Sequence, residues 1–144
     1  PASYFRLLYG RHPVHTFAKT QNTPLLNELC GENDLWLNED AAAEAGLANG
    51  DYVMLENQDG VQSGPIRVKA TPRIRRDAVF MAHGFGQQAK GLTNAYGKGA
   101  SDAQLISRYK LDPLSGGAGL RVNFVKINPV TASTTAVIND GKEA

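Results

Sequence analysis

The sequence predicts a mainly β domain built from about six short strands. Apolar residues alternate or run in short segments, as is typical of strands rather than long helices. Fifteen glycines and seven prolines divide these segments and predict many turns. A composition of 42% hydrophobic and 20% charged residues over 144 positions is that of a globular domain with its own core.

The strand expectations follow the apolar segments in order. They cover Tyr4–Tyr9, Asp34–Leu37, Tyr52–Glu56, Ile66–Ala70, Val79–Ala82 and Leu120–Ile127. Pro65 and Pro72 bracket the fourth of these, where a missing amide donor costs least. Gly60 is expected at the turn of a hairpin.

Two short helices are expected between the strands. Asn38 can cap a helix from Glu39 to about Ala45, and Gly46 can end it in left-handed geometry. Ser101 and Gln104 have the spacing of a capping box, which predicts a second helix up to Tyr109.

Several kinds of chemistry are disfavoured by the residues. A net charge of +1 does not favour a nucleic-acid partner, and no apolar run has the length of a membrane helix. Cys30, the single cysteine, excludes a disulfide framework and has no adjacent histidine or cation to activate it. Gly84 to Ala89 fits a dinucleotide pattern, but the glycines after it make the required helix improbable. We expect no metal ligands and no catalytic residues in this chain.

Polar residues gather in three segments that could bind a ligand. The first spans Arg11 to Asn22, and the others are His83–Gly86 and Gly99–Gln104. Their side chains can pair with phosphate or with the edge of a heterocycle, and glycine lets a ligand approach the backbone. A surface for an anionic, heterocyclic ligand is one interpretation, and ordinary solvated loops are the other.

The whole pattern resembles a known family. Leu37 to Val53 is similar to a segment of molybdopterin dinucleotide-binding domains, the C-terminal domains of molybdenum oxidoreductases of the dimethyl-sulfoxide reductase family. The opening segment Leu8 to Asn22 is most similar to the catalytic subunit of polysulfide or thiosulfate reductases. Asp112–Gly116 and Leu120–Ile127 resemble the closing segment of that family. The resemblance implies a six-stranded double-psi β-barrel, of the aspartate-decarboxylase-like type, with two or three short helices.

The resemblance also implies a site. The domain would close over a bis-molybdopterin guanine dinucleotide cofactor, and any iron–sulfur cluster would belong to other parts of the parent enzyme. The residues that would line the cofactor are Gly10, Arg11, His15, Thr16, Thr20, Gln21, Asn22, His83, Gly84, Phe85, Ser101, Asp102, Gln104 and Asn123.

The implied protein is a larger enzyme that reduces a sulfur compound, polysulfide or thiosulfate, in anaerobic respiration. The fragment would not be catalytic alone. Its partners would be the remaining domains of the same chain, an iron–sulfur electron-transfer subunit and a membrane anchor subunit, in the periplasm. Two alternatives remain: a protein-binding double-psi barrel, as in the N-terminal domains of some ATPases, and a stand-alone small subunit of a molybdenum or tungsten enzyme.

The domain is expected to span residues 1–130. Residues 131–144 are small and polar without apolar periodicity, so we expect a flexible C-terminal tail.

Overall fold

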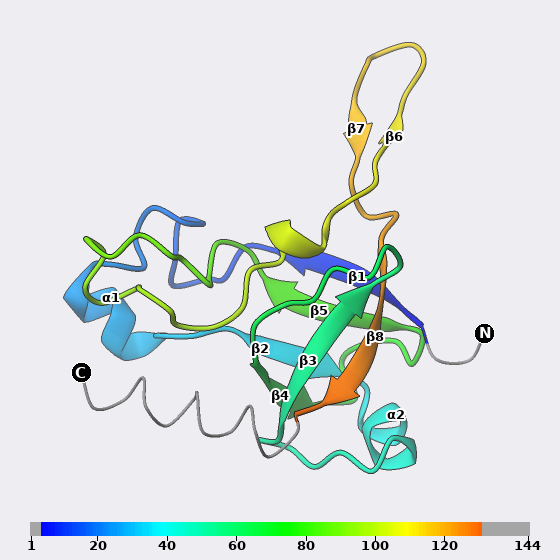
Figure 1. The fold of residues 1–144 in the computed structure, drawn as a ribbon, viewed down its shortest axis with the longest axis horizontal. Coiled ribbons are helices and arrows are strands. Elements are labelled where there is room, and N and C mark those ends of the chain that lie inside the picture. Colours follow the sequence, from blue (N-terminus) through cyan, green and yellow to red (C-terminus); the bar gives the residue numbers. More distant parts are fainter. Residues whose placement is uncertain (1–3, 131–144) are drawn as a thin grey trace.

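The computed structural model describes residues 4–130, which form a closed six-stranded barrel (Figure 1). The strands are β1 (Phe5–Gly10), β2 (Asp34–Leu37), β3 (Tyr52–Asn57), β4 (Ile66–Ala70), β5 (Ala78–Ala82) and β8 (Phe124–Pro129). Their order around the barrel is β1-β5-β2-β4-β3-β8, and β8 pairs with β1 to close it. The mainly β class and the six strands are therefore confirmed. The double-psi topology stays a prediction, and the expected tail lies outside the described residues.

Two of the strand pairs are parallel, and both join strands that are distant in sequence. β1 runs parallel to β5, with Leu8 opposite Phe80 and Gly10 opposite Ala82. β2 runs parallel to β4, and the other neighbours are antiparallel. Because β1 and β5 run in the same direction, the segments that follow them leave the barrel at the same end.

The barrel interior is filled by one side chain in two from each strand. Leu7, Leu35, Leu55, Val68 and Met81 are all at most 1% exposed and belong to a single apolar cluster. Burying such side chains contributes about 1.5–3 kcal/mol each. This cluster is the main source of stability, and it fixes the strands that carry the polar loops.

The helix α2 (Glu39–Glu44) confirms the first helix expectation. The side-chain oxygen of Asn38 accepts hydrogen bonds from the amides of Asp40 and Ala41, as an N-cap residue does. Gly46 follows with a φ of +68°, the left-handed geometry that glycine adopts without strain.

The second helix expectation is wrong. Ala103–Leu105 form only a 3-10 turn, η1, and the side chain of Ser101 does not cap it. The carboxylate of Asp102 is committed to His83, while Asn123 accepts hydrogen bonds from the amides of Ser107 and Arg108. These tertiary hydrogen bonds hold the segment after η1 extended, so the helix cannot continue. Strand β8 also begins four residues later than expected, at Phe124.

Two elements were not expected. Helix α1 (Pro24–Leu29) begins with a proline in its first turn, a position that proline tolerates well. A hairpin of β6 (Lys110–Leu111) and β7 (Ala118–Gly119) stands away from the barrel (Figure 1). None of the described helices is long and apolar enough to cross a membrane.

The turn after β3 carries an acidic residue that fastens the segment after η1. The carboxylate of Asp59 accepts hydrogen bonds from the side chains of Arg108 and Ser107, and the pKa of Asp59 falls to about 2 as a result. A carboxyl group with a lowered folded-state pKa stabilises the fold above its unfolded pKa. That stability is lost as the pH falls through the folded value.

We expect Asp59→Asn to lower the melting temperature at neutral pH. The difference from wild type should shrink from about pH 4 downwards and be small by about pH 2, because Asp59 takes up its proton over this range. Thermal unfolding followed by circular dichroism at a series of pH values measures this. A difference that stays constant over the whole range would contradict an ionic contribution from Asp59.

Candidate functional site

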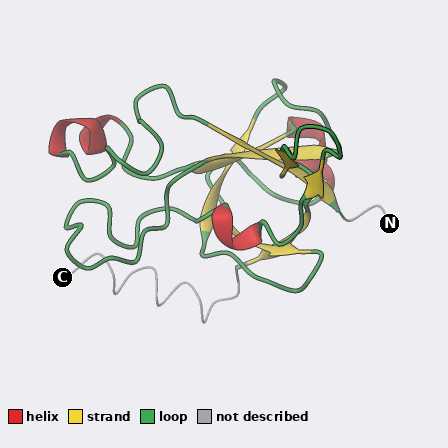
Figure 2. Ribbon diagram, turned by 90° about the horizontal axis from the view of Figure 1, so that it is seen from above, coloured by secondary structure: helices red, strands yellow, loops and turns green. Residues whose placement is uncertain are grey.

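Long loops and one short helix extend from one end of the barrel (Figure 2), and the sequence colours of Figure 1 identify them as the segments that follow β1 and β5. The polar segments expected to form a site belong to these loops. Arg11 follows β1 and His83 follows β5, and these strands are parallel and paired through Gly10 and Ala82. The carboxyl ends of adjacent parallel strands form a common edge, where ligands bind in many folds. The segment at Ser101–Gln104 joins them through the contact between Asp102 and His83.

His83 and Asp102 form a hydrogen-bonded pair at this end, in which Asp102 is buried and His83 is half-buried. Nδ1 of His83 lies 2.8 and 3.0 Å from the two carboxylate oxygens of Asp102, whose side chain is only 1% exposed. A carboxylate can only accept, so Nδ1 carries the hydrogen and Nε2 is the nitrogen left for another partner. The imidazole side chain is 35% exposed, and it can therefore meet a ligand from this end.

Aromatic rings and glycines fix the position of His83. The rings of Phe17 and Tyr9 lie 5.5 and 6.1 Å from the imidazole, centre to centre. Gly84 has a φ of +100°, and a Cβ there would come within 2.6 Å of the Ala18 amide nitrogen. The absence of a side chain at Gly84 lets the backbones of two loops touch: the first loop, residues 11–33 between β1 and β2, and the second loop, residues 83–102 between β5 and η1.

His15 lies inside the first loop and bonds only within it. Its Nε2 is 2.7 Å from the Cys30 carbonyl oxygen, so Nε2 donates there. Its Nδ1 lies 3.2 Å from the hydroxyl oxygen of Thr20. That oxygen accepts a hydrogen bond from the Thr16 amide. At 1% exposure His15 holds the loop together. Its role as a cofactor contact stays a prediction.

Gln21 and Asn22 tie the first loop to the second. Gln21 is 1% exposed, donates to the Phe17 carbonyl and accepts from Gln87. Asn22 accepts from the Asn94 amide and receives the Asn94 side chain on its own carbonyl. These side chains bond the two loops to each other.

Phe85 and Asn123 are buried as well. Phe85 is 4% exposed and lies edge-on against His15, with ring centres 5.6 Å apart. Asn123 is fully buried just before β8 and bonds to Gln58 and to the segment at Ser107–Arg108. It holds the segment that follows η1.

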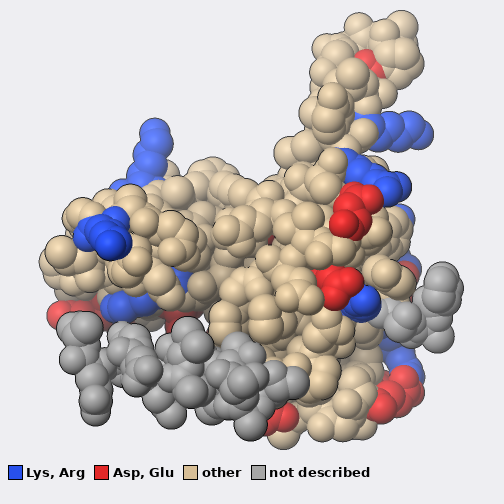
Figure 3. All heavy atoms as spheres, viewed as in Figure 1, with Lys and Arg blue, Asp and Glu red and all other residues tan. Residues whose placement is uncertain are grey.

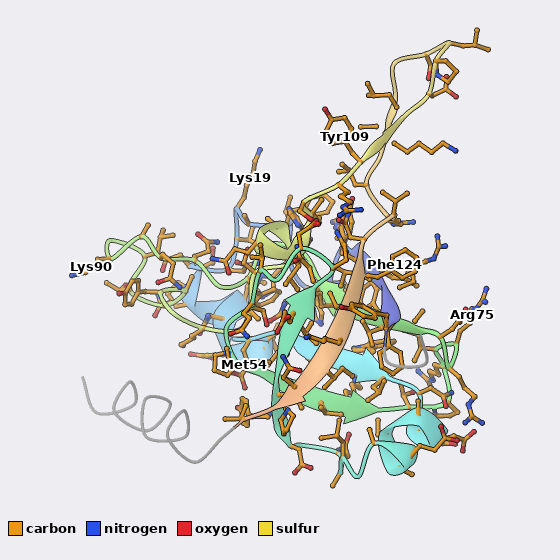
Figure 4. The ribbon with its side chains drawn as sticks, turned by 45° about the vertical axis from the view of Figure 1, so that its right-hand side comes forward. Lys19, Met54, Arg75, Lys90, Tyr109 and Phe124 are labelled. Carbon is orange, nitrogen blue, oxygen red and sulfur yellow. The ribbon has the colours of Figure 1, made fainter. Side chains whose placement is uncertain are left out.

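Of the predicted residues, Arg11, Thr16 and Gln104 are exposed, and six are half-buried: Gly10, Thr20, Asn22, His83, Gly84 and Ser101. Among residues 4–130, the Arg11 side chain donates to the His15 carbonyl alone, at 3.3 Å. Lys19 is a further exposed cation on the same loop (Figure 4). Asp102 is the only carboxylate in the three segments, and it is engaged by His83. This end is therefore rich in cations and neutral donors.

One residue that shapes the site was not foreseen. Asn33 is 2% exposed, donates to the carbonyls of Ala82 and Ala100, and accepts from the Ala100 amide. It fastens the end of β5 to the third segment. Gly99 makes this possible, because a Cβ there would come within 2.4 Å of the Asn33 side-chain oxygen. Nothing in the local sequence marks Asn33, since its partners are 49 and 67 residues away.

Two neighbouring groups of the first loop have shifted pKa values. The pKa of His12 is lowered, chiefly by burial and then by His15 and Lys69. The pKa of the Cys30 thiol is raised by burial and then by Asp34 and Glu32. A raised pKa keeps the thiol protonated, so Cys30 is poorly suited to act as a nucleophile.

These features define a small closed β-barrel domain whose polar loops gather at the carboxyl ends of two parallel strands. Residues 5–124 match the model of the molydopterin dinucleotide binding domain family. The chain belongs to this family.

Individual relatives are similar over most of this chain. The thiosulfate reductase molybdopterin-containing subunit PhsA of Salmonella typhimurium is 38% identical over 109 residues, which are 76% of this chain and 14% of that protein. The chlorate reductase subunit alpha of Ideonella dechloratans is 31% identical over 114 residues, or 77% and 11%. The structure of acetylene hydratase from Pelobacter acetylenicus matches with a TM-score of 0.66 at 18% identity, covering 88% of this chain and 18% of that one. The last match shows the fold alone. The chain spans about a seventh or less of the curated relatives it matches.

Proposed function

We propose that this chain is the domain that closes over the molybdopterin guanine dinucleotide of a molybdenum oxidoreductase reducing a sulfur compound, polysulfide or thiosulfate. Membership of the dinucleotide-binding family supports the cofactor class. The 38% identical relative, a thiosulfate reductase subunit, supports the sulfur compound, while the chlorate reductase relative makes chlorate the competing substrate.

The observation that carries the cofactor proposal is the chemistry of the loop end. Arg11, Lys19 and His83 lie in the loops that follow β1 and β5, together with hydroxyl and amide donors, and Asp102, the one carboxylate of the three polar segments, is paired with His83. A dinucleotide carries a pyrophosphate, and guanidinium, ammonium and imidazole groups are its usual partners. The residues present therefore fit a polyanionic, heterocyclic ligand.

Within this arrangement the open side chains have distinct roles. Arg11 would bind phosphate oxygens, and Thr16, Ser101 and Gln104 would donate to phosphate or to the heterocycle. His83, held by Asp102, would present Nε2 to the ligand. When bound, the molybdenum centre supplies the change of oxidation state, and the protein supplies binding and orientation.

The proposal includes a larger assembly. The rest of the polypeptide would carry the molybdenum ligand and the substrate site, and iron–sulfur and membrane-anchor subunits would complete it. The length of the curated relatives supports further domains. The periplasmic location rests on the family resemblance, and fractionation of the host cell tests it.

An amide-resolved NMR titration of the chain with GDP, up to millimolar concentration, tests the cofactor role. We expect shifts clustered at Arg11–Asn22, His83–Phe85 and Ser101–Gln104, because GDP carries the phosphate and base of the cofactor. The absence of shifts there, or shifts confined to Arg73–Arg76, would contradict the assignment and favour a protein-binding barrel.

A charge-matched pair of variants sharpens the test. Arg11→Gln should raise the Kd for GDP at least about fivefold, because a charge-assisted hydrogen bond to phosphate is lost. Arg75→Gln is the control, since Arg75 precedes β5, at the end opposite His83, and bonds to Asp77 (Figure 4). Equal weakening by both variants would show nonspecific charge attraction.

A further inference from the structure

One outer face of the barrel carries a row of large apolar side chains that are partly exposed to solvent. Leu8, Phe80, Trp36 and Lys69 stand opposite one another in a single row across β1, β5, β2 and β4. The rings of Trp36 and Phe80 meet edge-on with centres 5.5 Å apart, and Lys69 Nζ lies 4.9 Å from the Trp36 ring centre. This row is the floor of a groove of about 490 Å³, here called the outer groove, which Ile74 and Pro13 also line.

The outer face formed by β3 and β8 carries paired charges. On the outside of β3 and β8, Glu56 is paired with Lys126 at 2.8 Å and also accepts from Asn128. Figure 3 shows acidic and basic atoms side by side over these strands. The outer face of β3 and β8 thus contains a paired polar group, Glu56 with Lys126 and Asn128, whereas Leu8, Phe80 and Trp36 form an uninterrupted apolar row across β1, β5 and β2.

The rim of the outer groove carries more positive than negative charge. Its two carboxylates, Glu32 and Asp34, share one arginine, Arg67, whose Nε lies 2.9 Å from Asp34 and whose guanidinium nitrogen lies 3.8 Å from Glu32. Arg11 from the loop after β1 lines the groove as well. Lys69 and Arg73 also line the groove, and neither has an ion-pair partner among residues 4–130.

We propose that the outer groove docks an acidic polypeptide segment of the parent chain that inserts an aromatic or branched apolar side chain between flanking carboxylates. The apolar side chain would lie on Trp36 and Phe80, and the carboxylates would pair with Lys69 and Arg73. A sheet face of this composition is normally covered by another layer of the same protein. The source is the remainder of the polypeptide, so the inference rests on the proposed place of this domain in a longer enzyme.

The test uses three probes on the 144-residue chain, followed by NMR. The peptide acetyl-Glu-Glu-Phe-Glu-Glu-amide represents the proposed segment, its lysine counterpart reverses the charge, and phenyl phosphate represents a small anionic ligand. Trp36 is the only tryptophan, so its indole N–H gives one assigned signal in the groove. We expect the acidic peptide to shift Trp36, Phe80 and Lys69, and the lysine peptide to leave them unchanged.

Two double variants with the same change of net charge provide the control. Lys69→Glu with Arg73→Glu should raise the Kd for the acidic peptide about tenfold, because two attractions become repulsions. Lys90→Glu with Lys110→Glu alters exposed lysines outside the groove and should leave the Kd within about twofold. All four side chains are exposed, so the fold should persist in both variants.

Several outcomes would overturn the docking inference. They are no shift at Trp36 with the acidic peptide, equal effects of the two double variants, and tighter binding of phenyl phosphate than of the peptide, which would make the groove a small-ligand site. The GDP titration separates this inference from the cofactor proposal when it is followed at His83–Phe85 and Ser101–Gln104, because Arg11 also lines the outer groove. GDP shifts that persist while the peptide fails would leave the cofactor role standing, and the reverse result would remove only the cofactor role.

Discussion

Gly84→Ala is expected to destabilise the chain by about 3 kcal/mol or more. Two costs combine at this position. The φ of +100° is strained for any residue with a side chain, and the new Cβ would come within 2.6 and 2.7 Å of backbone atoms of Ala18 and Phe17. Because backbone atoms cannot rotate away as side chains do, the first loop must move. Urea unfolding followed by fluorescence measures the change.

Substitutions at two other glycines separate the cost of backbone strain from the cost of the steric contact. Gly97 has a φ of +67° with no atom within 4 Å of its Cβ position, so Gly97→Ala carries strain alone and should cost about 1 kcal/mol. Gly91 has neither problem, and Gly91→Ala should change the free energy of unfolding by less than about 0.5 kcal/mol. If Gly84→Ala and Gly97→Ala cost the same, the contact between the first and second loops is not as tight as described.

The second large effect is expected at Asn123. Its side-chain oxygen accepts from Gln58 and from the amides of Ser107 and Arg108, and its side-chain nitrogen donates to the carbonyls of Arg108 and Leu120. Asn123→Ala removes the fully buried side chain and leaves four partly buried backbone groups without their partners, so we expect a loss of about 3 kcal/mol in the free energy of unfolding. The same urea experiment measures it.

Asn128→Ala is the matched control, because the side chain of Asn128 makes one hydrogen bond, to Glu56, on the outside of the barrel. It should cost less than about 1 kcal/mol. A small loss at Asn123, together with a weaker response to GDP, would instead assign Asn123 to the ligand. The unfolding and GDP measurements together thus show whether Asn123 holds the segment after η1 or contacts the ligand directly.

Local sequence signals predicted the structure correctly where a residue interacts with residues close to it in the sequence. The cap at Asn38 and the left-handed Gly46 depend on residues within one turn, and both were predicted correctly. The same reasoning failed at Ser101, because the capping box competes with the pair between Asp102 and His83, 19 residues away. A local pattern cannot show such a partner.

The outer groove did have a signal in the sequence. Leu7–Leu8, Leu35–Trp36–Leu37 and Val79–Phe80–Met81 are apolar on both faces of their strands, as is typical of strands covered on both sides. What the sequence alone could not give was the row formed by these residues, which depends on the register of β1, β5 and β2.

The sequence by itself determined the strand segments, the class of fold and the three polar segments, because hydrophobic periodicity and turn chemistry are local properties. Only the tertiary structure decided which polar residues face outward. His15, Gln21 and Asn123 were grouped with Arg11 and His83 as ligand contacts, yet the first three are buried and bonded to the chain, whereas Arg11 and His83 are open. The reason is physical: polar side chains satisfy one another wherever parallel strands bring distant loops together, and that pairing is set by the barrel rather than by any segment alone.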